Sequence, residues 1–78
     1  MKADKELVAS GLACLNLTPD IKRAISPMKG NEILKVINDD PASRLGVAAW
    51  CRLTGHVLLD TQELNKQETV FYIQKKNS

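Results

Sequence analysis

The sequence predicts an α+β fold: a two-layer α/β sandwich in the order β-α-β-α-β-β, with two helices on one face of a four-stranded mixed sheet. Two helix-start signals, at residues 18–20 and 40–41, alternate with apolar segments that are typical of strands. The last third of the chain holds two strand patterns with no helix between them. Where the strands flanking a helix are parallel, right-handed crossovers place both helices on the same face. A length of 78 residues favours one core, so residues 1–78 are expected to form a single domain.

The first helix is predicted from the residues at its start. A short strand is expected over residues 6–9, followed by a loop that reaches Cys14. Thr18 can cap free amides, Pro19 lacks an amide that the first helical position does not need, and Asp20 suits the positive end of a helix. The helix is therefore predicted to begin at Thr18 and Pro19.

The second strand is predicted between two turn signals. Pro27 makes the first helix short, and Gly30 suits the turn that follows it. Residues 32–37 contain four large aliphatic side chains and are expected to form a largely buried strand. The polar residues and proline at 38–41 end this strand.

The second helix is expected to begin at Asp40, which is a good N-cap, with Pro41 as its first helical residue. Gly55 is a plausible C-terminal cap. Helical spacing places four apolar residues on one stripe, which is predicted to face the core: Leu45, Ala48, Ala49 and Leu53.

The last two strands are predicted at residues 56–60 and 69–75, joined by a polar hairpin segment. Phe71 and Tyr72 are adjacent, so they are expected to point to opposite faces of the sheet. A pair of aromatic rings on one sheet face, as used to stack RNA bases, is therefore not expected.

Charge does not identify a partner for this chain. The formal net charge is +2, and Lys and Arg are interspersed with Asp and Glu, so direct nucleic-acid binding is not expected. No apolar run approaches the roughly 18 to 20 residues of a membrane span, and the N-terminus lacks the apolar core of a signal peptide. A cytoplasmic protein without membrane association is the expectation.

Cys14 and Cys51 are far apart in the sequence and are expected to be free thiols in a reducing compartment. Four ligands in paired spacing are absent, so no metal site is predicted. Free cysteines more often pack than react, and this applies above all to Cys51 within the second predicted helix.

Three stretches of the sequence resemble the TusA/SirA family of small sulfur carriers: Gly-Leu-Ala-Cys at residues 11–14, Ile-Asn-Asp-Asp-Pro-Ala-Ser at 37–43, and Ala-Trp-Cys-Arg-Leu-Thr-Gly-His at 49–56. The resemblance implies a sulfur carrier in which Cys14 holds a persulfide. It also implies a sulfur-donor protein, such as a cysteine desulfurase or a rhodanese-like protein, and a sulfur-acceptor protein. Uses in such families include tRNA thiolation, cofactor synthesis and sulfur oxidation, and neither a metal nor an organic cofactor is implied.

The chain departs from the family pattern next to the cysteine. The family motif reads Cys-Pro-x-Pro, whereas Leu15 and Leu17 stand at the two proline positions. Val8 stands where the family usually has Asp. These departures leave an alternative open, in which the chain is a non-catalytic interaction or regulatory module that kept the fold and lost sulfur transfer.

Other residues have a structural and a functional interpretation. Lys22 and Arg23 are typical of a solvated helix face, or could attract an acidic partner or steady a persulfide anion. Cys51 could serve as a resolving thiol if it lay near Cys14. His56 is expected to start a strand and Trp50 to pack partly buried.

Overall fold

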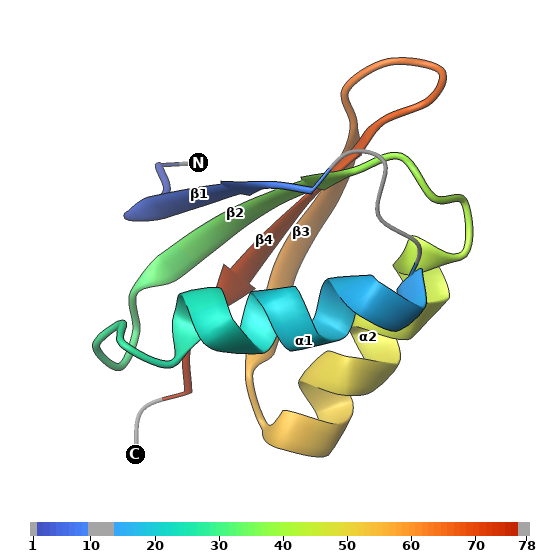
Figure 1. Cartoon of the computed structure of the whole chain (residues 1–78). Helices are drawn as coiled ribbons and strands as arrows, with labels where there is room; N and C mark the ends of the chain where they lie inside the picture. Colours follow the sequence, from blue (N-terminus) through green and yellow to red (C-terminus); the bar gives the residue numbers. More distant parts are fainter. Residues whose placement is uncertain (1, 10–13, 77–78) are drawn as a thin grey trace.

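The computed structural model describes residues 2–9 and 14–76. The chain forms six elements in the predicted order β-α-β-α-β-β, which confirms the α+β fold class (Figure 1). Their bounds are β1 (Lys5–Val8), α1 (Cys14–Ile25), β2 (Ile33–Asn38), α2 (Ser43–Thr54), β3 (Val57–Glu63) and β4 (Thr69–Gln74).

The four strands form one mixed sheet in the order β1-β2-β4-β3. β1 pairs parallel with β2, and β4 pairs antiparallel with both β2 and β3. Both helices cover the same face of the sheet (Figure 1). The right-handed crossover from β1 through α1 to its parallel neighbour β2 accounts for the position of the first helix.

The core lies between the sheet and the two helices. Alternation along β2 turns Leu34, Val36 and Asn38 inward, and these three side chains are fully buried. Phe71 is buried in this core, whereas Tyr72 lies on the opposite face of β4, as predicted. Helix α1 contributes a buried stripe at helical spacing: Leu17, Ile21, Ala24 and Ile25.

Helix α1 begins at Cys14, so the predicted start at Thr18 and Pro19 is wrong by about one turn. Leu17 and Ile21 are four residues apart and both have no exposed surface, which requires helical geometry before Pro19. Burial of one leucine stabilises the fold by about 1.5–3 kcal/mol. That gain is comparable with the ~3 kcal/mol cost of a proline inside a helix, so local propensity does not decide the boundary.

Helix α2 begins at Ser43, later than predicted, and its N-cap residue Ala42 makes no side-chain capping bond. Asp40 instead stabilises the turn before the helix. Its Oδ1 accepts a hydrogen bond from the Ala42 amide at 2.9 Å, and its carbonyl accepts one from the Ser43 amide at 3.0 Å. At the other end, Gly55 adopts φ +85° and its amide donates to the Cys51 carbonyl at 2.9 Å, so the predicted C-terminal cap is confirmed.

The prediction of which apolar stripe of α2 faces the core is wrong. Leu45 is 81% exposed and Leu53 is 87% exposed, while Val47 and Cys51 are buried. The sheet and α1 already supply large side chains to the core, so the inner face of α2 carries smaller ones that let the helix approach closely. Both patterns have helical periodicity, and only packing selects between them.

Two turns complete the fold. Gly30 lies in the turn before β2, as predicted, and in this turn the neighbouring Asn31 adopts the left-handed φ of 72°. The predicted hairpin between β3 and β4 is confirmed. In it, Asn65 Oδ1 accepts hydrogen bonds from the Gln67 amide at 2.9 Å and the Glu68 amide at 2.8 Å.

Candidate functional site

Both helices begin at the same end of the sheet. β1 and β2 are parallel, so their carboxyl ends lie at one edge, and each strand leads into a helix. Figure 1 shows the first turns of α1 and α2 at this end of the molecule. The start of α1 at Cys14 and the start of α2 at Ser43 are therefore brought together by the topology.

Cys14 is the first residue of α1 in the described backbone. The first amides of a helix have no partner within the helix, and they favour negative charge near the first turn. If the helix began at Thr18, Cys14 would lie too far from the first turn to feel this electrostatic effect. The rest of the predicted loop, residues 10–13, and the Cys14 side chain lie outside the described residues, so the role of this thiol stays a prediction.

Asn38 joins the end of β1 to the turn after β2. Its Nδ2 donates to the Ala9 carbonyl at 2.8 Å, and its Oδ1 accepts from the Asp40 amide at 2.8 Å. The Ala9 amide also donates to the Ile37 carbonyl at 2.8 Å. Sequence reasoning missed Asn38, although it follows Leu34 and Val36 at the spacing of the buried face of a strand. A polar side chain at such a position needs buried partners.

A polar hollow adjoins this end of the sheet. The hydroxyl of Ser43, at the start of α2, is buried and has no hydrogen-bond partner among the residues that the structure describes. Arg44 pairs with Glu63 of β3 at 3.0 Å. The hollow has a volume of about 380 Å³ and lies between the β2–α2 turn and the β3–β4 hairpin, lined by Asp39, Pro41, Arg44, Lys66, Gln67 and Thr69.

Cys51 is a core residue, which confirms its structural interpretation. It is 3% exposed, and burial raises the pKa of its thiol to about 11. A thiol that stays protonated is a poor nucleophile. The arrangement therefore does not favour Cys51 as a resolving thiol.

Lys22 and Arg23 lie in the last turn of α1, and both are exposed. Arg23 forms an ion pair with Asp20 on the same helix. Lys22 lies eight positions after Cys14 on the same helix, which is about 12 Å along the axis. The structure does not bring Lys22 to Cys14, so the idea that it steadies a persulfide anion finds no support.

A second set of side chains lies at the opposite end of the helices. Trp50 packs partly buried against the core, as predicted, and stacks on His56 with ring centroids 5.2 Å apart. His56 lies one residue before β3, and its Nδ1 accepts a hydrogen bond from the Lys76 amide at 3.0 Å. Burial, followed by the charges of Lys76 and Lys75, lowers the pKa of His56.

The described residues contain no cluster of three or more His, Cys, Asp or Glu side chains able to hold a metal ion. Within residues 2–9 and 14–76, neither helix has the length and apolar character needed to cross a membrane.

Comparison with known proteins matches residues 5–75 to the family described as Sulfurtransferase TusA. The chain is 35% identical over 75 residues to the Bacillus subtilis protein named "Putative sulfur carrier protein YrkI", and the match covers 96% of this chain and 99% of that protein. It is 29% identical to a sulfur carrier candidate of Aquifex aeolicus and 36% identical to YrkF of Bacillus subtilis. Those matches cover 38% and 34% of the longer relatives.

Proposed function

The chain belongs to the TusA sulfurtransferase family, and on this premise we propose that it is a sulfur carrier in which Cys14 holds the transferred sulfur as a persulfide. The observation that supports this most directly is the position of Cys14 at the first residue of α1, inside the matched segment. The amides of the first helical turn favour the thiolate form that sulfur transfer requires.

The transfer consists of two exchanges. The Cys14 thiolate attacks the terminal sulfur of a persulfide on a donor protein, a new S–S bond forms, and the old S–S bond breaks to release the donor thiolate. A nucleophile of the acceptor then attacks the terminal sulfur on Cys14 and releases the Cys14 thiolate. Each step conserves electrons, so no external oxidant or reductant is needed. The donor is expected to be a cysteine desulfurase or a rhodanese-like protein, in the cytoplasm.

The proposal has to account for the two prolines of the family motif, which are replaced in this chain by Leu15 and Leu17. Leu17, at the second proline position, has no exposed surface and packs with Ile21 in the core. That substitution therefore has a packing reason and does not create an exposed apolar patch.

The alternative, an interaction module without sulfur transfer, is favoured by a different observation. Leu45 and Leu53 project from α2 into solvent and leave two large apolar side chains uncovered.

Intact-protein mass spectrometry after incubation with a cysteine desulfurase and cysteine separates the two functions. We expect the protein to gain the mass of one sulfur atom, to lose it on reduction, and to gain none as Cys14→Ser. Cys51→Ser is the matched control and should still gain sulfur. A folded wild-type protein that gains no sulfur, with its thiols titratable, would favour the interaction module.

A further inference from the structure

A groove between the C-terminal ends of α1 and α2 has a concentration of positive charge. It has a volume of about 450 Å³, within the range of small-molecule sites. We call it the basic groove, and its lining residues are Lys22, Ile25, Ser26, Trp50, Leu53, Thr54, His56, Lys75 and Lys76. This lining contains three lysines and no carboxylate, although the whole chain has nine Asp and Glu for eleven Lys and Arg.

Two of the three lysines are available to a ligand. The Lys75 ammonium donates to the Ser26 carbonyl at 2.8 Å and to the Met28 carbonyl, so it holds the turn after α1. Lys22 and Lys76 are exposed, and neither forms an ion pair within the described part of the chain. The negative end of α1 favours a cation at Lys22, but Lys76 follows β4 and has no such role.

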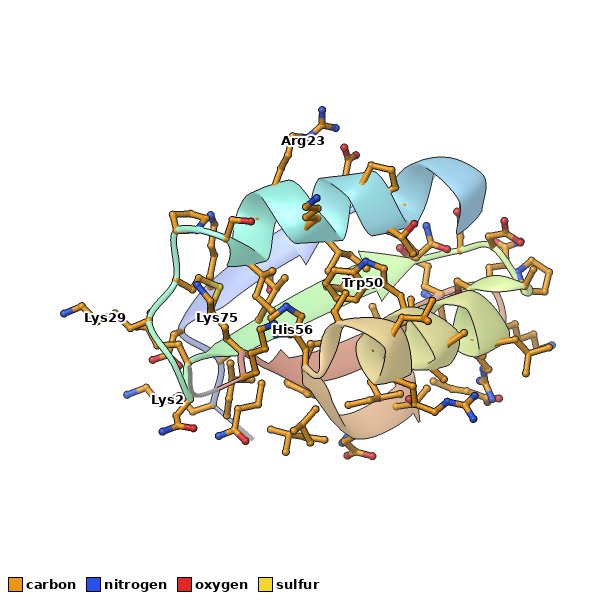
Figure 2. The ribbon with its side chains drawn as sticks, turned by 90° about the horizontal axis from the view of Figure 1, so that it is seen from below. Lys2, Arg23, Lys29, Trp50, His56 and Lys75 are labelled. Carbon is orange, nitrogen blue, oxygen red and sulfur yellow. The ribbon has the colours of Figure 1, made fainter. Side chains whose placement is uncertain are left out.

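His56 adds a directed donor. Because the Lys76 amide donates to Nδ1, the neutral ring carries its proton on Nε2. Stacking on Trp50 fixes the orientation of this ring, and the lowered pKa keeps it neutral near pH 7. In Figure 2, Trp50, His56 and Lys75 lie close together beside the helices.

The groove also has an apolar wall, formed by the exposed side chain of Leu53 and the half-buried ring of Trp50, whereas Ile25 is a core residue with almost no exposed surface. An inorganic ion alone would leave this wall in contact with water. An anion that carries a ring can cover the wall and place its charge between the lysines.

We propose that the basic groove binds an aromatic or heterocyclic monophosphate, such as a nucleotide unit, with its phosphate near Lys22 and Lys76 and its ring against Trp50 and Leu53. This site is separate from the proposed sulfur site, because the groove lies at the other end of α1 from Cys14. The proposal stands whether or not Cys14 carries sulfur.

Trp50 is the sole tryptophan, so its fluorescence reports directly on the groove. The titration uses AMP, phenyl phosphate, inorganic phosphate and adenosine, with excitation at the red edge of indole absorption. We expect a saturable change with AMP and phenyl phosphate, and at least tenfold weaker binding of inorganic phosphate and of adenosine. A short single-stranded RNA tests whether the nucleotide unit is free or part of a polymer, and binding of the RNA together with AMP supports the proposal.

Substitutions test the position of the phosphate. Lys22→Gln and Lys76→Gln should each weaken AMP about tenfold, because each removes a charge-assisted contact. Lys29→Gln is the matched control, since Lys29 is exposed, lies outside the groove and points away from it in Figure 2. Bound AMP should also raise the pKa of His56, followed by NMR, since a nearby anion favours the imidazolium form.

Several results would overturn the proposal. The first is a lack of saturable fluorescence change with both monophosphates. The second is equal affinity for inorganic phosphate and AMP. The third is an equal loss of AMP affinity in Lys22→Gln, Lys76→Gln and the control Lys29→Gln. Binding of RNA without binding of either monophosphate would also overturn it, since the groove as proposed accepts a single unit.

Discussion

Asn38→Ala should destabilise the protein far more than the same substitution at an exposed asparagine that makes as many hydrogen bonds to the backbone. The Asn38 side chain is fully buried and joins the Ala9 carbonyl to the Asp40 amide, with both hydrogen bonds at 2.8 Å. The alanine substitution removes the hydrogen-bond partner of the Ala9 carbonyl and that of the Asp40 amide. Ala9 is 3% exposed, so water cannot readily replace the lost donor.

The expected size follows from the two contacts. A buried polar group left without a partner costs about 1–3 kcal/mol, and the partly exposed Asp40 amide should cost less than the Ala9 carbonyl. Asn38→Ala should therefore lower the free energy of unfolding by about 2–4 kcal/mol. That is a large share of the roughly 5–15 kcal/mol by which domains are stable.

Urea denaturation followed by circular dichroism measures this difference. Asn65→Ala is the matched control, because Asn65 accepts two backbone hydrogen bonds in the exposed hairpin, from Gln67 and Glu68. Water can satisfy those amides, so the control should lose less than about 1 kcal/mol. Equal losses in the two variants would refute the idea that the buried Asn38 bridge holds the end of β1.

The remaining predictions concern single positions. At pH 8, Cys51 should resist iodoacetamide in the native protein and react in urea, because its thiol stays protonated; equal rates would contradict its burial. Pro19→Ala should raise the free energy of unfolding by about 1–3 kcal/mol, because it restores an amide inside α1; a loss would place the start of the helix at Pro19. In denaturation experiments Val47→Ala should cost about 2 kcal/mol and Leu45→Ala less than about 0.5 kcal/mol, and the reverse order would restore the leucine stripe to the core. The pKa of His56 is lower in the folded than in the unfolded protein, so the unfolded chain binds this proton first and stability falls as pH drops through the ordinary value of 6.5. His56→Gln should flatten that part of the stability profile, and an unchanged profile would contradict the lowered pKa.

The order of the six elements was determined by local signals. Prolines and glycines separate the segments, alternation marks the strands, and Gly55 suits a left-handed cap wherever the helix packs. The family resemblance also came from short stretches of sequence, and it brought Cys14 forward as the candidate residue. None of these signals depends on which residues become neighbours across the fold.

Tertiary structure decided the remaining features, because each depends on burial against a distant segment. Burial of Leu17 moved the start of α1 past Pro19 to Cys14, although the local start signal favoured Thr18. Packing against the sheet determined that the stripe of α2 with Val47 and Cys51 faces inward, and Leu45 remains exposed to solvent.

The two candidate sites show the same division. Asn38 became a buried bridge only because β1 and β2 pair in parallel and bring Ala9 beside it. The basic groove combines Lys22 of α1, Trp50 of α2 and Lys76 after β4, and no spacing in the sequence links these three residues. Sequence periodicity determines which residues can share a face, whereas packing against the rest of the chain determines which face is buried and which side chains meet.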